Sequence, residues 1–307
     1  MEELKIFCPA TIANISCGFD VLGVALDSVG DEMIIRKVAH KGIRITKLEG
    51  QDLPMETDKN VAGVAGLAFL AESDFDGGFE IEIYKKIKAG SGIGSSAASS
   101  TGAVWAMNRL LGNPFPTSKL VEFAMEGERL ASGVAHADNV APALFGGFTL
   151  VRSYEPLDII PIASPSELFA TVIHPQIEIK TSDSRKILKA HITLKEGIKQ
   201  WGNLGGLIAG LFTEDYDLIG RSLEDHIVEP IRSILIPGFQ DVKKGALASG
   251  ALGCGISGSG PSIFAFSRGA ETAKKVGDSM MAVYEKIGID HDIHISKINT
   301  EGIRIIN

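Results

Sequence analysis

The residues that point most directly to chemistry form the run GSGIGSSAASS, from Gly90 to Ser100. Glycine lets backbone N–H groups approach a ligand without interference from a Cβ atom. If a helix begins in this run, its first N–H groups have no partner within the helix and favour an anion such as phosphate. The hydroxyl groups of Ser95 and Ser96 could then add ligands for the phosphate or for a magnesium ion bound to it. Taken alone, the run is equally typical of a flexible turn with serine caps.

The segments on either side of this run predict the helix that it needs. FEIEIYKK precedes it, and the apolar Phe79, Ile81 and Ile83 alternate there with polar residues, as in a half-buried strand. SSAASSTGAVWAMNRLLG follows, is rich in alanine, leucine and methionine, and stops at a Gly-Asn-Pro sequence, which predicts a helix. The glycine run is therefore predicted to connect a strand to a helix.

Two familiar phosphate loops are excluded. The dipeptide Gly-Lys is absent from the sequence, so the chain has no Walker A lysine. GCGISG, from Gly253 to Gly258, matches the pattern G-x-G-x-x-G. A helix-like segment precedes it and the strand-like SIFAF follows it, whereas a dinucleotide fingerprint needs the reverse order.

Two further segments combine polar residues with apolar or glycine-rich surroundings. PATIANISCGFDVLGVAL places Asn14 and Asp20 in a predicted loop, which a turn with side-chain hydrogen bonds would also explain. HADNV supplies His136, Asp138 and Asn139 to a second predicted loop.

A helix is predicted before this second loop, from Thr117 to about Ala131. Its apolar face comprises Leu120, Phe123, Ala124, Gly127 and Ala131. Glu126 and Glu128 flank this face on opposite sides, so periodicity leaves open which of the two carboxylates is functional.

Two arginines follow in the second half of the chain. In IKTSDSRKILKAHITL a strand end leads into a helix that Thr181 or Ser182 could cap, with Asp183 in its first turn. Arg185 is then expected in the first helical turn, where the helix dipole disfavours a cation, which favours a functional role. For Arg232, in DHIVEPIRSILIPGF, a surface salt bridge is the default explanation.

These motifs together resemble a known superfamily. GSGIGSSAA resembles the phosphate loop of the GHMP kinases, the small-molecule kinases that include galactokinase, homoserine kinase, mevalonate kinase and phosphomevalonate kinase. PATIANISCGFDVLG and GISGSGPSIFAF resemble the first and third motifs of this superfamily, and the three occur in order between Pro9 and Phe266. PATIANISCGFDVLGVAL and HADNVAPALFGGF are similar to the homoserine kinases in particular.

The resemblance implies a nucleotide site and a metal site. The ATP-contacting residues would be Asn60, against the adenine, and Lys88, Ala89, Gly90, Ser91, Gly92, Ile93, Gly94, Ser95, Ser96, Ala97 and Ala98. Mg²⁺ would be held by Ser96 and Glu128, which chooses Glu128 over Glu126. The sequence departs from the family at Lys88, where a proline is usual, and at Ile93, where a leucine is usual.

The resemblance also implies a substrate site, made of Asn14, Asp20, His136, Asn139, Arg185 and Arg232, and a catalytic set of Glu128, Asn139, Thr181 and Arg185. We assign Asp20 to the substrate ammonium, directly or through Asn14, Arg232 to the carboxylate and Arg185 to the phosphate in transfer. Thr181 would contact the hydroxyl end of the substrate. Several relatives have an aspartate where this chain has Asn139, which cannot take a proton at neutral pH, so catalysis would depend on positioning and charge stabilisation.

The expected activity is ATP-dependent phosphorylation of L-homoserine to O-phospho-L-homoserine in threonine biosynthesis. The first alternative is a kinase for another small alcohol such as mevalonate, which predicts an acid at position 139 and a nearby lysine. The second is a non-catalytic sensor that retains the fold, which predicts the loss of Glu128 or Ser96. Both residues are present.

The elements that must position these residues follow an α+β order. The resemblance implies an N-terminal ATP-binding domain like ribosomal protein S5 domain 2, residues 1–160, and a ferredoxin-like C-terminal domain, residues 161–307. In the second domain we predict the strands ELFATVIHP and SIFAF, helices at Gly197–Phe212, Asp241–Leu252 and Glu271–Ile287, and a terminal strand pair.

Composition narrows the class of protein. The 307 residues carry a net charge of −8 and no block of Lys or Arg, which argues against a nucleic-acid binder. No segment approaches the roughly 18 to 20 apolar residues of a membrane span, and the N-terminal segment does not read as a secretory signal. The three cysteines form no CxxC pair, so we expect reduced thiols and a cytoplasmic location. The oligomeric state stays open, with a homodimer among the options.

Overall fold

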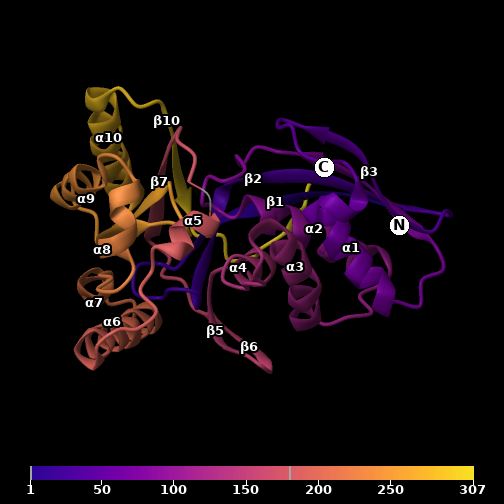
Figure 1. Ribbon diagram of the computed structural model, residues 1–307, viewed down its shortest axis with the longest axis horizontal. Helices are drawn as coiled ribbons and strands as arrows, with labels where there is room; N and C mark the ends of the chain where they lie inside the picture. Colours follow the sequence, from indigo (N-terminus) through magenta and orange to yellow (C-terminus); the bar gives the residue numbers. More distant parts are fainter. Residues whose placement is uncertain (1, 180) are drawn as a thin grey trace.

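The computed structural model describes residues 2–179 and 181–307, apart from the side chains of Thr181 and Ser182. Figure 1 shows two bodies, with the N-terminal half of the chain on the right and most of the C-terminal half on the left. The short helix α5 (Thr181–Lys186) lies between the two bodies.

The first body is built on a seven-stranded sheet in the order β11-β1-β2-β4-β3, in which β5 pairs with β2 and β6 pairs with β5. Among the described strand pairs of this sheet, β3 with β4 is parallel and the others are antiparallel. The 17-residue β2 is long enough to pair with β1, β4 and β5 along different parts of its length. The strands are β1 (Glu3–Ala13), β2 (Leu22–Val38), β3 (Gly42–Glu49), β4 (Gly78–Tyr84), β5 (Phe148–Tyr154), β6 (Leu157–Ile162) and β11 (Arg304–Ile305).

Helices cover one face of this sheet (Figure 1): α1 (Val61–Glu72), α2 (Ser95–Leu110), α3 (Thr117–Ser132) and α4 (Val140–Phe145), with the 3-10 turn η1 (Thr57–Lys59) before α1. The predicted strand, loop and helix around the glycine run are confirmed as β4, residues 85–94 and α2. Small side chains let α2 pack closely on the sheet, because a Cβ atom on Gly102 would lie 2.4 Å from Cys8 Sγ. The phosphate-loop helix is therefore fixed on the first sheet.

The second body has a four-stranded antiparallel sheet in the order β10-β7-β9-β8. With helices after β7 and after β9, this is the βαββαβ arrangement of a ferredoxin-like fold, as predicted. The strands are β7 (Leu168–Pro175), β8 (Gly253–Ile256), β9 (Ile263–Arg268) and β10 (His291–Lys297). The helices besides α5 are α6 (Leu194–Thr213), α7 (Tyr216–Ser222), α8 (Glu229–Arg232), η2 (Ser233–Leu235), α9 (Phe239–Ala248) and α10 (Ala270–Ile287).

Two details differ from the sequence-based expectations, and a third confirms one of them. The last two strands are not a pair, since β10 joins the second sheet and β11 pairs with β1 in the first. Helix α9 ends at Ala248 rather than Leu252, just before Gly250, which has φ +99°. GCGI forms β8 instead of a phosphate loop, which confirms the rejection of the dinucleotide fingerprint. The division at residues 160 and 161 stays a prediction.

One hydrophobic core extends across both bodies, and the second body has a further core of its own. The rings of Phe148 on β5 and Phe266 on β9 lie 5.8 Å apart, edge to face. Backbone N–H groups of Asp27 and Ser28 on β2 both donate to Ser296 Oγ on β10. Over the described ranges, no helix is long and apolar enough to cross a membrane.

Candidate active site

The glycine run has a backbone that needs glycine. Gly90, Gly92 and Gly94 have φ values of +76°, +83° and +73°, in the left-handed region that other residues rarely adopt. A Cβ atom on Gly92 would lie 2.7 Å from the carbonyl oxygens of Ser257 and Gly260. A Cβ atom on Gly94 would lie 2.0 Å from Thr11 Oγ1.

The first and third motifs hold the phosphate loop in place through hydrogen bonds to its carbonyl oxygens. Three of its carbonyl oxygens accept hydrogen bonds: Ser91 O from Ser262 N (3.2 Å), Gly92 O from Ser257 Oγ (2.7 Å) and Ile93 O from Thr11 N (3.1 Å). The N–H groups from Gly92 to Ser96 have no acceptor within the described part of the chain. Open N–H groups at the start of a helix are suited to an anion, and phosphate binding at this loop stays a prediction.

Most of the other residues that were predicted to contact ATP make contacts within the protein instead of exposing their side chains to a ligand. Ser95 Oγ donates to Ile87 O at 2.9 Å, so this hydroxyl is used inside the loop. Ala97 and Ala98 are buried in α2. Lys88, where the family usually has a proline, is exposed, and its ammonium donates to Gln176. Ala89 N donates to Gln51 Oε1 at 2.7 Å.

Asn60, the predicted adenine contact, has a structural role. Its Oδ1 accepts from Ala62 N at 3.0 Å and caps α1, and its Nδ2 donates to Pro54 O at 2.7 Å. A contact between this side chain and adenine would compete with these bonds, so the adenine assignment stays a prediction.

The carboxylate of Glu128 lies beside the first turn of α2. The residue is 9% exposed, and burial raises the pKa of its carboxyl to about 7, against the opposing effect of a hydrogen bond with Ser96. Its Oε1 atom has no hydrogen-bond partner among the described residues. Glu126 instead binds Arg129 at the surface, with N–O distances of 3.2 and 3.3 Å. The helix therefore turns Glu128 inward, although the predicted apolar face is wrong at Ala131, which is exposed.

Asn14 and Asp20 lie near the two ends of the loop that connects β1 to β2. Both residues have positive φ angles, +72° and +59°. Asn14 Oδ1 accepts from Asp20 N at 3.0 Å, and Asn14 Nδ2 donates to Gly258 O at 2.7 Å. Gly258 belongs to the third motif, so Asn14 joins the first motif to the third.

Asp20 and Arg185 form a forked ion pair. Arg185 Nη1 and Nη2 donate to the two carboxylate oxygens of Asp20 at 3.0 and 2.9 Å. His136 Nδ1 lies 4.0 Å from Asp20 Oδ1, and burial lowers the pKa of this imidazole. The expectation that Arg185 lies in the first turn of its helix is wrong: α5 has six residues, begins at Thr181, and carries Arg185 in its last turn.

Arg232 is buried, with 3% exposure, so the default of a surface salt bridge is wrong. Its Nε donates to Ser184 O at 3.1 Å and its Nη1 to Gly258 O at 3.3 Å. Within residues 2–179 and 181–307, no carboxylate lies close enough to form an ion pair with it. Burial, then the charge of Arg185, lower the pKa of Arg232 to about 10. Its guanidinium and that of Arg185 lie 5.0 and 5.4 Å from the centre of the Phe19 ring.

Asn139 lies between β1 and the phosphate loop. Its Oδ1 accepts from Thr11 Oγ1 at 2.7 Å and would lie 3.1 Å from a Cβ atom on Gly94. The remaining predicted residue, Thr181, begins α5, but its side chain lies outside the described residues.

Two residues of the site received no role from the sequence. Tyr154 OH donates to Asp20 O at 3.0 Å and accepts from Ala137 N at 3.3 Å, so it ties the Asp20 turn to the loop of His136. Asp138 is buried, and burial, then Asp20 and Glu128, raise its carboxyl pKa to about 7. Asp138 lies within the HADN segment, whereas Tyr154 lies in a strand without any motif.

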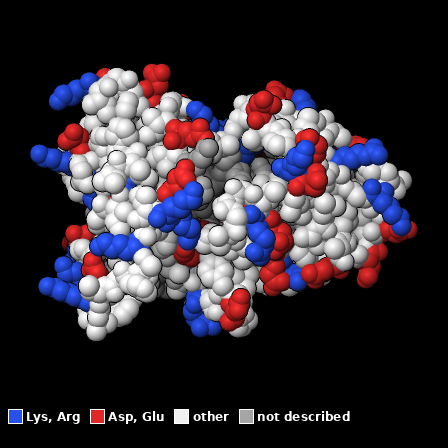
Figure 2. Space-filling model, viewed as in Figure 1, with Lys and Arg blue, Asp and Glu red and all other residues white. Residues whose placement is uncertain are grey.

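The site lies where the two bodies meet. Figure 2 shows the surface hollowed between them, next to α5. On this face Lys, Arg, Asp and Glu are interspersed without a large basic area. Such a surface fits a small-molecule site better than a nucleic-acid interface.

Known proteins share both the sequence and the fold of this chain. Residues 60–147 match the family described as GHMP kinases N terminal domain, and residues 207–286 match GHMP kinases C terminal. The homoserine kinase of Chlorobium phaeobacteroides (strain BS1) is 47% identical over 320 residues, which cover 100% of both proteins. The crystal structure of homoserine kinase from Cytophaga hutchinsonii is 53% identical, with a TM-score of 0.96 and coverage of 100% of this chain and 98% of that chain.

A mevalonate kinase is a more distant neighbour. The structure of L. major mevalonate kinase in complex with R-mevalonate is 15% identical, with a TM-score of 0.70 and coverage of 96% of each chain, so the likeness is in fold alone. By its motifs, its full-length sequence identity and its fold, the chain belongs to the homoserine kinase family of the GHMP kinases.

Proposed function

We propose that the protein transfers the γ-phosphoryl group of ATP to the hydroxyl oxygen of L-homoserine, giving ADP and O-phospho-L-homoserine for threonine biosynthesis. One observation carries the proposal: Asn14 and Arg232 of the acceptor side both donate to Gly258 O, and a Cβ atom on Gly258 would lie 3.1 Å from Gly92 O, so the acceptor side adjoins the open phosphate loop. A kinase needs this proximity, because phosphoryl transfer depends mainly on positioning and charge stabilisation.

The nucleotide phosphates bind to the N–H groups from Gly92 to Ser96. Glu128 and Ser96 fit Mg²⁺, because Mg²⁺ takes one or two protein oxygens together with phosphates and water, and Glu128 Oε1 is buried without a partner among the described residues. When bound, the ion neutralises charge on the phosphate oxygens. The described residues contain no cluster of three or more His, Cys, Asp or Glu that could hold a metal alone, which suits an ion that arrives with ATP.

The acceptor side provides one group for each charge of a zwitterionic amino acid. Asp20 is the anion for the ammonium, and the buried Arg232 is the cation for the carboxylate, which a planar guanidinium binds well. Arg185 already pairs with Asp20, so it is placed to exchange this contact for the phosphate in transfer. Asn139 orients the acceptor and takes no proton.

The alternatives lack comparable support. Mevalonate carries no ammonium group, so Asp20 would have no partner in the substrate, and position 139 is an amide rather than an acid. A sensor without activity would not need Glu128 beside the phosphate loop.

The test is ADP release with Mg-ATP and a panel of homoserine, mevalonate, galactose and shikimate. We expect homoserine to give by far the highest kcat/KM. Equal rates across the panel would contradict the substrate assignment, and the absence of ADP release with every acceptor would contradict the kinase activity itself. A cytoplasmic location and a homodimer stay predictions, which cell fractionation and light scattering can check.

A further inference from the structure

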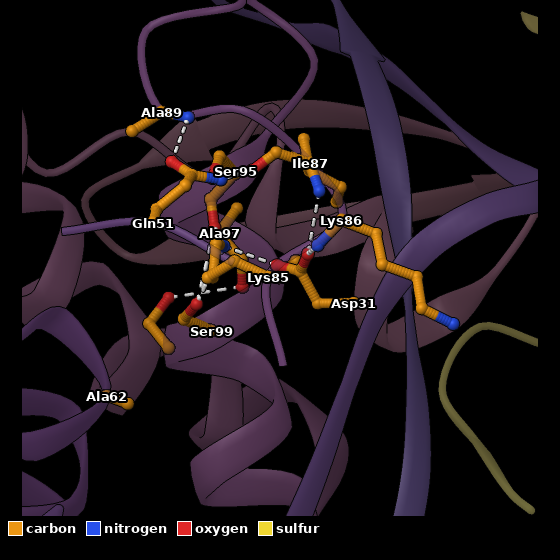
Figure 3. Close-up of polar contacts among 12 residues, drawn as sticks. Asp31, Gln51, Ala62, Lys85, Lys86, Ile87, Ala89, Ser95, Ala97 and Ser99 are labelled. Carbon is orange, nitrogen blue, oxygen red and sulfur yellow. Dashed lines mark hydrogen bonds and ion pairs between the residues drawn. The ribbon is translucent and has the colours of Figure 1, made fainter. Parts of the chain in front are cut away.

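A buried ion pair lies under the phosphate loop and takes no part in the assignments above. Lys85 follows β4 directly, Asp31 lies on β2, and their side chains are 2% and 0% exposed. Figure 3 shows the ammonium of Lys85 directed at the carboxylate of Asp31, with backbone N–H groups of the loop directed at the same carboxylate. The pair is therefore closed off from solvent and next to the nucleotide site.

One carboxylate oxygen of Asp31 holds the start of the loop. Asp31 Oδ1 accepts from Lys86 N at 2.7 Å and from Ile87 N at 2.9 Å. These are the residues that leave β4 and enter the loop. Asp31 Oδ2 binds the ammonium of Lys85.

The ammonium of Lys85 holds the end of the loop. Besides Asp31, Lys85 Nζ donates to Ser95 O at 2.8 Å and to Ser99 Oγ at 3.1 Å. Ser95 is the first residue of α2, so this bond fixes the helix start. Through Lys85, the single carboxylate of Asp31 ties both ends of the loop to the first sheet.

Stability alone does not explain such a pair. Taking two charges out of water is costly, and replacing a buried ion pair by uncharged residues is often neutral or stabilising. All three ammonium hydrogens of Lys85 have acceptors, so the pair is geometrically complete. The pair costs desolvation energy and has all its hydrogen bonds satisfied. Its role is therefore better explained by the precise positions in which it holds the groups around it.

We propose that Lys85 and Asp31 are positioning residues for ATP, which fix the distance between the two ends of the phosphate loop so that its N–H groups face the phosphates before the nucleotide binds. The inference rests on the proposed nucleotide site. A loop that is ordered in advance binds more tightly, because less conformational entropy is lost on binding. Without the pair, the loop keeps its glycines but loses its fixed ends.

The test uses the paired variant Asp31→Asn/Lys85→Met, which removes both charges and leaves none buried alone. The control is Glu32→Gln/Lys86→Met, which removes the neighbouring ion pair, where Lys86 is 60% exposed and Glu32 is 23% exposed. Calorimetry with Mg-ATP and, separately, with L-homoserine gives both dissociation constants for each protein. We expect the buried-pair variant to bind ATP at least about tenfold more weakly, which is about 1.4 kcal/mol, with homoserine affinity within about twofold of the wild type. The control should keep both affinities.

The outcomes separate the inference from the proposed function. If wild-type protein binds no Mg-ATP, the proposed nucleotide site fails. If the wild type binds ATP and the buried-pair variant binds it equally well, the positioning role is overturned. Equal losses for both ligands, or failure of the buried-pair variant to fold, would show that the pair stabilises the whole body instead, which also overturns the inference.

Discussion

Arg232→Leu tests the acceptor side of the site most sharply. The guanidinium is buried, has no carboxylate partner among the described residues, and binds the carbonyl oxygens of Ser184 and Gly258. In the proposed complex it pairs with the substrate carboxylate. Leucine keeps part of the side-chain volume and removes the charge, so the substrate carboxylate would be buried without a cation.

The expected loss in homoserine binding is about 2 to 5 kcal/mol, the range for breaking a buried charge pair. This corresponds to an increase in the dissociation constant for homoserine of between about 30-fold and a few thousandfold. Binding of Mg-ATP should change little, because Gly258 O, which lies behind the phosphate loop, keeps its second hydrogen bond from Asn14. The two ligands should therefore respond very differently.

Stability should move in the opposite direction to binding. Burial lowers the pKa of Arg232 from its ordinary 12.5 to about 10, which corresponds to a cost of about 3 kcal/mol for the charged form. Removing the charge removes that cost, along with two hydrogen bonds of about 1 kcal/mol each or somewhat more. We expect the free energy of unfolding of Arg232→Leu to equal or exceed that of the wild type.

The assay is calorimetry with each ligand and urea unfolding, with Arg221→Leu, an exposed arginine on α7, as the control. A variant that lost ATP affinity and kept homoserine affinity would place Arg232 on the wrong side of the cleft. A variant destabilised by several kcal/mol would show that the guanidinium mainly holds the structure.

Three further predictions concern Glu128 and Tyr154. Glu128→Gln should lower kcat for ADP release strongly, whereas the surface change Glu126→Gln should leave it near wild type; equal effects would mean that the inward carboxylate does not serve the metal. Because the Glu128 pKa is raised in the folded protein, its contribution to stability is present below its unfolded pKa of about 4.5 and is lost as pH rises to about 7. Urea unfolding without ligands should show this decline of up to roughly 3 kcal/mol, and it should be smaller in Glu128→Gln. Tyr154→Phe should raise the KM for homoserine several-fold and leave the KM for ATP unchanged, measured by steady-state kinetics.

Local patterns predicted the parts of the fold that depend on neighbours along the chain. The alternation before Gly90 and the small-residue helix after it are both confirmed, because a strand and a helix each impose a period on their own sequence. The same alternation runs Phe79, Ile81, Ile83 and on to Lys85, so the sequence contained a signal that this lysine is buried. A Lys-Lys pair at a strand end is usually solvated, so the alternation alone does not identify Lys85 as buried.

Features set by distant contacts could not be predicted in this way. Periodicity left Glu126 and Glu128 equivalent, and only the contact of α3 with the first turn of α2 turns Glu128 inward. Arg232 became a buried site residue through bonds to residues 48 and 26 positions away. The resemblance to the homoserine kinases, which is confirmed, carried information of this kind that the pattern of a single sequence lacks.

The pairing of β11 with β1 has a consequence for synthesis. Phe7 and Arg304 are register partners, so one edge of the first sheet is covered only by a strand that the ribosome makes after the whole second sheet. Domains usually fold in order as they emerge. Here the edge of β1 stays unpaired until β11 appears, and an open edge is a template for pairing with another chain. Because β11 carries none of the candidate site residues, we expect a substitution that breaks it to act through this open edge and to favour aggregation of the newly made protein.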